Sequence, residues 1–227
     1  MFRAGAKLAH DHLCAQGHRL PSFGRYYRMH WLAIRGHVIA AKLRGREFHS
    51  APVLNRCCQR LGIPLSPAEL LDLCWQWYLP LSATATVEAG LAQLLASLRN
   101  QGYVLGIVSN TFVPGAVLDQ HLDQLDLLTY FPETHRIYSS EFGLPKPNPA
   151  IYRHALAQIH TPAEETLFVG DHPKNDVLGP KRLGLATALK CPARKFTARR
   201  ARRTQPDYHI ETLAELPAIL ATRPLPA

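Results

Sequence analysis

The sequence has few cysteines, and none of them stands in a paired spacing. Five cysteines occur among 227 residues, and no two form the Cys-x-x-Cys pair that is typical of zinc sites and redox couples. The sequence also contains no run of about 18 apolar residues that could span a membrane. Its first residues lack the apolar middle region of a signal peptide. These absences favour a cytoplasmic protein with reduced thiols and no membrane partner.

Acidic residues are missing from one strongly basic tract, residues 190–203. The formal net charge of the chain is +9, and seven of its basic residues lie in this tract, which leaves +2 for the remainder. Such a tract could bind nucleic acid or another acidic surface. The alternative is a solvated loop after the last strand, since blocks of like charge commonly face water. Phe196 is the only aromatic residue there, so base stacking has little support and the loop is favoured.

The first 80 residues lack the alternating pattern and the β-branched runs of strands. Apolar residues recur at mixed spacings of three and four, which is the pattern of helices that bury one face. Before the last of these helices, Ser66 is a predicted N-cap, with a proline after it and Glu69 three residues on. Trp75, Trp77 and Tyr78 make this helix aromatic, which favours core packing over a cofactor site. The predicted helices cover residues 4–16, 26–43, 50–61 and 66–79.

Short apolar strands alternate with helices after residue 82. This alternation predicts the α/β class, with a doubly wound parallel sheet of the Rossmann type. A chain of this length suits one domain, or a core domain with a smaller appendage. We therefore predict an all-helical domain over residues 1–82 and an α/β core over residues 83–227. The predicted strands cover residues 103–108, 136–138, 167–169 and 185–189, and the predicted helices residues 88–98, 117–128 and 148–158, with a further helix ending at Arg182.

The most informative segment covers residues 166–176. The apolar run 167–169 is typical of a buried strand in a parallel sheet. Gly170 lets the chain turn at the carboxyl end of that strand, which is where open α/β sheets bind their ligands. Asp171 and Asp176 would place two carboxylates there, a donor set that suits Mg²⁺. The alternative is a polar turn in which Asp176 caps the next helix.

Polar groups follow two further strands. Ser109 and Asn110 come directly after the strand that ends at Val108, and Lys146 lies in a loop stiffened by prolines. Because the carboxyl ends of parallel strands share one edge, these groups are expected to meet Asp171. The Ser109 hydroxyl and nearby N–H groups could hold phosphoryl oxygens, and Lys146 could supply a positive charge to the same anion. Taken singly, Ser109 could be a helix cap and Lys146 a solvated loop residue.

The order and spacing of these motifs resemble the haloacid dehalogenase superfamily, whose members are mostly Mg²⁺-dependent phosphatases. The resemblance covers residues 85–220 well, and residues 1–82 are compatible with the helical cap of many members. It implies that Ser109 and Asn110 bind the phosphoryl group of a small substrate, that Lys146 is catalytic, and that Asp171 and Asp176 bind Mg²⁺. The matching segments are Val108-Ser109-Asn110, Gly143-Leu-Pro-Lys146-Pro-Asn-Pro-Ala-Ile-Tyr152 and Val169-Gly-Asp171-His-Pro-Lys-Asn175-Asp176.

The first motif of that family is missing from this sequence. The family places its nucleophile in an apolar strand that ends Asp-x-Asp near the N-terminus, whereas no two aspartates here are separated by one residue. Asp11 lies on a predicted helix between two histidines, so we expect it on a solvated face. The resemblance therefore implies no nucleophile in this chain. We expect that the sequence starts late and that an N-terminal segment bearing the aspartate motif precedes it.

The missing motif also has a structural consequence. By resemblance, the first strand would lie between the strands at 167–169 and 103–108. Strands lie about 4.8 Å apart, so its absence is expected to leave a gap or two rows of unpaired backbone groups.

Three functions remain open from the sequence. The first is a phosphatase of small phosphorylated metabolites that works through an aspartyl-phosphate and is inactive as written. The second is a metal-free dehalogenase, against which the acidic pair argues. The third is a non-catalytic relative that binds a phosphorylated ligand or, through residues 190–203, nucleic acid.

Overall fold

The computed structural model describes residues 1–222, leaving aside the side chains of residues 198, 200 and 201. These residues form two compact units, each built from segments that are separate in the sequence. Two later segments of the chain group with the helical residues, so these units are not a simple division of the chain at one point. The predicted domain boundary after residue 82 remains a prediction. The helical unit comprises Met1–Thr86, Asn110–Leu128 and Tyr138–Pro145, and the α/β unit comprises Val87–Ser109, Thr129–Ile137 and the chain from Lys146 onward.

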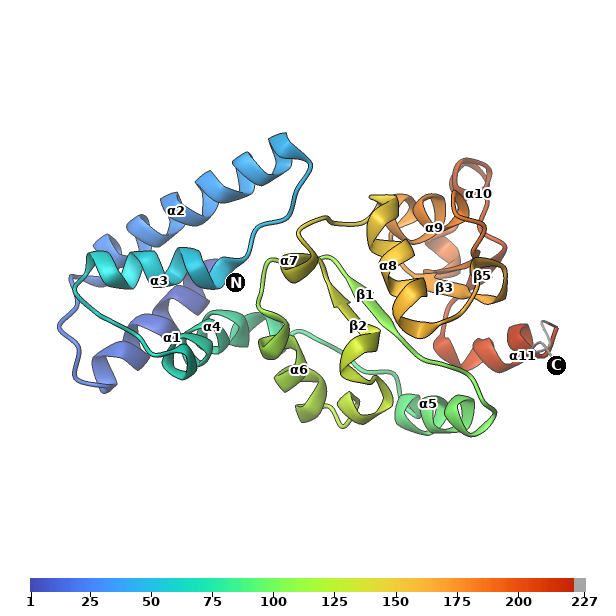
Figure 1. The fold of residues 1–227 in the computed structure, drawn as a ribbon, viewed down its shortest axis with the longest axis horizontal. Coiled ribbons are helices and arrows are strands. Elements are labelled where there is room, and N and C mark those ends of the chain that lie inside the picture. Colours follow the sequence, from blue (N-terminus) through green and yellow to red (C-terminus); the bar gives the residue numbers. More distant parts are fainter. Residues whose placement is uncertain (223–227) are drawn as a thin grey trace. The chain divides into compact units, whose positions relative to one another are not determined.

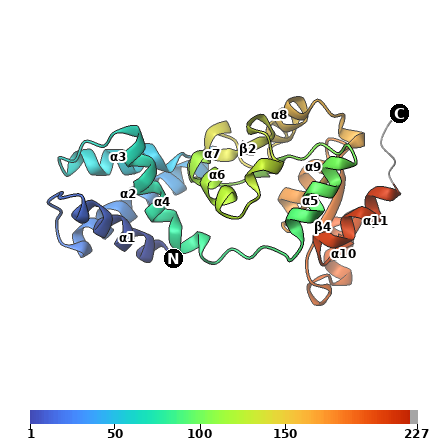
Figure 2. The same ribbon diagram turned by 90° about the horizontal axis from the view of Figure 1, so that it is seen from below.

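Four consecutive helices build most of the helical unit (Figures 1 and 2). α4 packs against α1 and α3, and α2 packs against α1 and α3. All four lie within a few residues of the predicted positions. Two shorter helices from the later segments, α6 and α7, complete the unit. The helices are α1 Phe2–Ala15, α2 Phe23–Arg44, α3 Ser50–Arg60, α4 Pro67–Ser82, α6 Gly115–Gln124 and α7 Ser139–Phe142.

Helix α4 begins at the capping box that the sequence predicts. The backbone N–H of Glu69 donates to the Ser66 hydroxyl at 3.3 Å, and the backbone N–H of Ser66 donates to the Glu69 carboxylate at 2.8 Å. Each bond satisfies a donor that the first turn of a helix would otherwise leave unpaired.

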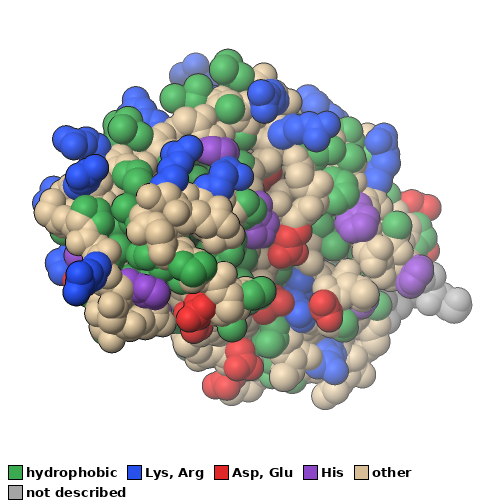
Figure 3. Space-filling model, turned by 60° about the vertical axis from the view of Figure 1, so that its left-hand side comes forward, with side chains coloured by type: hydrophobic (Ala, Val, Ile, Leu, Met, Phe, Trp, Pro, Cys, Tyr) green, Lys and Arg blue, Asp and Glu red, His purple; other side chains and the backbone are tan. Residues whose placement is uncertain are grey.

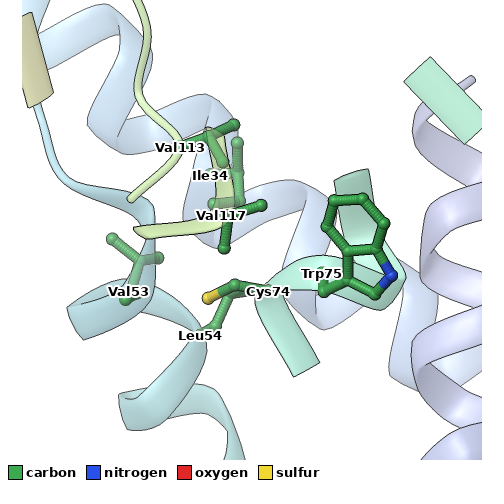
Figure 4. Packing of buried hydrophobic residues seen from close by; sticks show 8 residues of the cluster. Ile34, Val53, Leu54, Cys74, Trp75, Val113 and Val117 are labelled. Atoms are coloured by element: carbon green, nitrogen blue, oxygen red, sulfur yellow. The ribbon is translucent and has the colours of Figure 1, made fainter. Parts of the chain in front are cut away.

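The aromatic side chains of α4 pack in the core of the helical unit, as predicted. Trp75 is buried beside Cys74 and faces Val117 of α6 and Ile34 of α2, with Val53 and Leu54 of α3 nearby (Figure 4). A second buried cluster contains Leu13, Tyr26 and Leu73. All five cysteines are free thiols.

The α/β unit contains two small sheets, flanked by helices. The strands β3, β4 and β5 are parallel, with Leu167 opposite Ala186 and Ala188 opposite Tyr208. β1 pairs with β2 in the other sheet. The predicted α/β class is confirmed. The elements are α5 Leu91–Asn100, β1 Ile107–Ser109, β2 Arg136–Tyr138, α8 Pro149–Ile159, β3 Leu167–Gly170, the turn η4 Pro173–Leu178, α9 Gly179–Lys181, β4 Ala186–Lys190, α10 Ala198–Thr204, β5 Tyr208–Ile210 and α11 Leu216–Ala221.

The two sheets are separate where a single continuous sheet is typical of the class. In the described part of the chain, β1 pairs only with β2, and β3 only with β4. A cavity of about 370 Å³ lies between them, lined by Ile107 and Val108 of β1 and by Leu167 and Val169 of β3. β1 is three residues long instead of the predicted six. Its only partner among the described strands is the short β2, and this pairing limits the length of β1. Such a gap between these strands is expected from the sequence, and its attribution to an absent first strand remains a prediction.

The second half of the basic tract is the helix α10, Ala198–Thr204, which corrects part of the predicted loop at 190–203. Before it, the tract contains the end of β4 and a short 3-10 turn at Ala193–Lys195. Arginine and alanine both have high helix propensity, and they dominate α10. Its arginines 199, 202 and 203 are exposed, as a solvated tract requires. The like charges of this tract favour a solvated loop, but its helix-forming composition outweighs them over Ala198–Thr204.

Basic side chains are not confined to that tract. On the face drawn in Figure 3, Lys and Arg side chains are distributed among hydrophobic ones and do not gather in one continuous stripe.

None of the helices in the described residues is both long enough and apolar enough to span a membrane.

Candidate active site

The candidate site is built around the turn that follows β3. Asp171 comes directly after Gly170 and is exposed, and the chain then enters η4, which carries the buried Asp176. A Cβ atom at position 170 would lie 2.5 Å from the carboxyl carbon of Asp176. Glycine therefore lets the Asp176 side chain pack against the end of the strand.

Asp176 forms a buried ion pair with Lys146. The ammonium of Lys146 donates to Asp176 Oδ1 at 2.7 Å, and the side chains retain only 11 % and 6 % of their exposure. The other carboxylate oxygen, Oδ2, accepts the backbone N–H of His172 at 2.9 Å. His172 is the N-cap residue of η4, and Asp176 accepts the backbone N–H of that residue, so Asp176 contributes to the cap as well as to the ion pair. Asp176 is not a solvated group. Lys146 is not a solvated loop residue either.

Aromatic side chains hold Lys146 and η4 in place. The Lys146 ammonium lies 5.2 Å from the centroid of the Phe168 ring, a cation–π contact from β3. Tyr152 of α8 packs edge-on against Phe168 at 5.5 Å and donates its hydroxyl to the carbonyl of Asn175. Burial raises the pKa of Tyr152, which keeps this hydroxyl protonated as a donor. Tyr152 thus ties α8, which follows the lysine loop, to the acidic turn.

The loop that bears Lys146 leads directly into α8. Asn148 accepts the backbone N–H of Ala150 at 3.0 Å, with Pro149 in the first turn, as the sequence predicts. This N-cap lies two residues after the lysine and fixes the start of the helix. The backbone around Lys146 is therefore ordered by a local signal.

Ser109 and Asn110 lie at the end of β1, as predicted. Ser109 belongs to the α/β unit, together with Lys146, Asp171 and Asp176, whereas Asn110 is the first residue of its segment in the helical unit. The next residue, Thr111, donates its backbone N–H to the Ser139 hydroxyl at 2.8 Å. The roles of Ser109 and Asn110 in binding a phosphoryl group remain predictions.

The donor set fits a hard divalent cation. No group of three or more His, Cys, Asp or Glu side chains in the described residues is placed to enclose a metal ion. Mg²⁺ does not need such a cage, because it usually keeps several waters and binds one or two carboxylates together with substrate phosphate. Asp171 offers an exposed carboxylate, and the Asp176 carboxylate has about four lone-pair positions, of which Lys146 and His172 take two.

Asp11 lies on the exposed surface of α1, as expected. It pairs with Lys7 one turn earlier on the same helix. The hydrogen bond from Lys7 holds the pKa of the Asp11 carboxyl below its usual range, with a smaller contribution from His10. The residue is thus a surface ion-pair partner.

Two features of the site were missed by sequence reasoning. The pairing of Lys146 with Asp176 joins residues 30 positions apart, and no local pattern signals it. The tie from Tyr152 to η4 spans 23 positions. The only hint was that Tyr152 falls within the segment that resembles the family's third motif.

Comparisons with known proteins identify the family of this chain. Residues 72–190 match the model of the family described as haloacid dehalogenase-like hydrolase. Glyceraldehyde 3-phosphate phosphatase of Pyrococcus abyssi is 31 % identical over 131 residues, which are 57 % of this chain and 52 % of that protein. The chain therefore spans about half the length of that relative.

Two further proteins match nearly the whole chain. Ribulose-1,5-bisphosphate 5-phosphatase of Halopiger xanaduensis is 28 % identical over 203 residues, which are 86 % of this chain and 81 % of that protein. A 2-haloacid dehalogenase from Pseudomonas syringae has a similar fold, with a TM-score of 0.64 at 21 % identity, covering 97 % of this chain and 91 % of that one. The fold is therefore shared by proteins named for different reactions.

Proposed function

The chain belongs to the haloacid dehalogenase-like hydrolase family, and from that premise we propose that its α/β unit is the phosphoryl-binding core of a Mg²⁺-dependent phosphatase of small phosphorylated metabolites. The observation that carries the proposal is the buried Lys146–Asp176 pair beside the exposed Asp171. Relatives named as phosphatases of a triose phosphate and a pentose bisphosphate support the substrate class.

Lys146 is the proposed anchor for the transferring phosphoryl group. Its contacts with Asp176 and the Phe168 ring hold the ammonium in one position. A cation that is already oriented loses little entropy when it binds an anion, and it costs no reorganisation as charge develops on the phosphoryl oxygens. Asp176 is then a positioning group for Lys146 as well as part of the acidic pair.

Asp171, together with Asp176, would hold the metal ion. A bound Mg²⁺ supplies positive charge that draws the phosphoryl oxygens to the carboxylates. Ser109 would donate its hydroxyl to the same phosphoryl group, with Asn110 beside it in the chain.

We further propose that this chain binds phosphoryl groups with little or no turnover. It contains no two aspartates separated by one residue, and Asp11 is engaged with Lys7 on the surface of α1. In an assay with p-nitrophenyl phosphate and Mg²⁺, the rate should stay near background. A Mg²⁺-dependent rate that depends on Lys146 would show that another side chain supplies the nucleophile.

The site assignment is tested by calorimetric titration of inorganic phosphate into the protein in the presence of Mg²⁺. Ser109→Ala should weaken phosphate binding about tenfold, because the variant loses one hydrogen bond to a charged phosphate oxygen. Ser97→Ala is the matched control, since Ser97 is an exposed serine on α5 of the same unit. Equal affinities for the two variants would remove Ser109 from the site.

A further inference from the structure

Three basic side chains line one pocket of the α/β unit. It is open, has a volume of about 680 Å³ and is formed between η4 and the segment that carries α10. Lys174 of η4 and Arg199 and Arg203 of α10 line it, and no acidic side chain of the described residues does. Three positive charges around one hollow favour an anionic ligand.

The arginines reach this pocket because of their spacing. Arg199 and Arg203 are four residues apart on α10, so they project from the same face of the helix. Lys174 approaches from η4, which packs against α10. Arg202 lies on the same helix and is exposed, but it does not line the pocket.

The segment before α10 is anchored to the core. Phe196 packs against Val177, Leu189 and Cys191. Its ring stacks on His209 with centroids 3.9 Å apart and planes 5° apart. At the other end of α10, Thr204 is buried. The arginines are therefore carried by a helix held at both ends, which lowers the cost of ordering them around a ligand.

The topology places this pocket at the same edge of the sheet as Asp171. β3 and β4 are parallel neighbours, with Gly170 opposite Leu189. The carboxyl ends of both strands therefore share one edge. Asp171 follows β3, and the chain leaves the end of β4 to reach α10. Lys174 belongs to the turn that starts two residues after Asp171.

We propose that the pocket of Lys174, Arg199 and Arg203 binds a second phosphate group of the substrate, so that the preferred ligands are small bisphosphorylated molecules. This inference rests on the proposed function, in which the first phosphate binds at Lys146 and Asp171. Arginine suits the role because its planar fork can donate two parallel hydrogen bonds to phosphate. A single hollow with no aromatic lining fits a phosphate group better than a nucleic-acid strand, which needs an extended track of cations and stacking surfaces.

The test compares fructose 1,6-bisphosphate with fructose 6-phosphate in calorimetric titrations of the full chain with Mg²⁺. The bisphosphate should bind at least about tenfold more tightly, because it gains charge-assisted hydrogen bonds. The double variant Arg199→Ala/Arg203→Ala should remove this preference while changing monophosphate affinity less than about twofold. Lys174→Ala, on the opposite wall, should reduce the preference independently. Arg202→Ala should keep it.

Each other outcome overturns a defined part of the account. Equal affinity for the two sugars, with monophosphate binding that still requires Asp171, would overturn the second site and leave the proposed function standing. Failure of both sugars to bind would overturn the proposed function as well. A loss of preference in Arg202→Ala as large as in the double variant would overturn the assignment to this pocket. Binding of an oligonucleotide that depends on Arg199 and Arg203, without a bisphosphate preference, would assign the helix to nucleic acid instead.

Discussion

Lys146 and Asp176 illustrate, at the scale of single residues, how one contact can serve both stability and function. Both side chains are buried, and each balances the charge of the other at 2.7 Å. Removing one partner of such a pair leaves an isolated buried charge, which is far more costly than replacing both. The pair therefore holds η4 against the loop before α8 while it orients the ammonium.

We predict that Lys146→Met lowers the free energy of unfolding by about 3 kcal/mol, because it leaves the Asp176 carboxylate buried without its cation. Adding Asp176→Asn should recover part of this loss. Urea unfolding of the wild type, both single variants and the double variant measures the coupling. The corresponding cycle for Lys7 and Asp11, an exposed pair, should show little or no coupling. Additive effects at Lys146 and Asp176 would contradict the pairing.

His30 is a second residue whose burial has a measurable consequence. It is fully buried in α2, and its Nδ1–H donates to the carbonyl of Tyr26 at 2.9 Å, since a carbonyl can only accept. Burial lowers its pKa to about 4, against the opposing effect of this hydrogen bond. The folded protein thus holds a neutral imidazole at pH values where the unfolded chain binds a proton.

We therefore predict that stability falls as the pH falls from about 6.5 towards 4. In that window the unfolded state binds more protons than the folded state, so acid favours unfolding. Between pH 7 and pH 5, His30 should account for about 2 kcal/mol of lost stability, since one pKa unit corresponds to about 1.4 kcal/mol. Urea unfolding at both pH values should show this excess loss in the wild type and in His18→Gln, but not in His30→Gln. Equal losses in all three proteins would contradict it.

At the scale of elements, the turn after β3 depends on the glycine at its start. Gly170→Ala would place a Cβ atom 2.5 Å from the Asp176 side chain. We predict a loss of about 1–3 kcal/mol from overpacking, together with weaker phosphate binding as Asp176 and Lys146 shift. Gly36→Ala in the middle of α2 is the control, because nothing lies within 4 Å of its new Cβ. That variant should be as stable as the wild type or up to about 1 kcal/mol more stable. Full phosphate affinity in Gly170→Ala would contradict the proposed role of the turn.

Elements with local signals could be predicted from the sequence, and those that depend on distant partners could not. The capping box at Ser66 and the cap at Asn148 involve residues within four positions of each other, and both helices begin where expected. β1 is shorter than predicted, because the length of a strand depends on its neighbours. α10 replaces the second half of the loop predicted at 190–203. In the candidate site, local patterns predicted Lys146, Asp171 and Asp176, whereas the pairing of Lys146 with Asp176 depends on the folded chain and has no local signal.

At the scale of the whole molecule, the described strands form two separate sheets, β1–β2 and β3–β4–β5. The cavity between the two sheets is lined by apolar residues of both. The groups that we assign to phosphoryl binding in the α/β unit lie at the ends of β1 and β3 and in the loop before α8. Phosphate recognition can therefore be examined separately from turnover, which we propose to be low or absent.

The most direct test of the central claim is the affinity of the protein for inorganic phosphate, measured by calorimetric titration with and without Mg²⁺. If Asp171 holds the metal beside Lys146, Mg²⁺ should tighten phosphate binding about tenfold or more, and Asp171→Asn should abolish the increase. Asp123→Asn, a change of an exposed aspartate on α6, should leave it intact. An affinity that is the same with and without Mg²⁺, or an increase that survives in Asp171→Asn, would contradict the account.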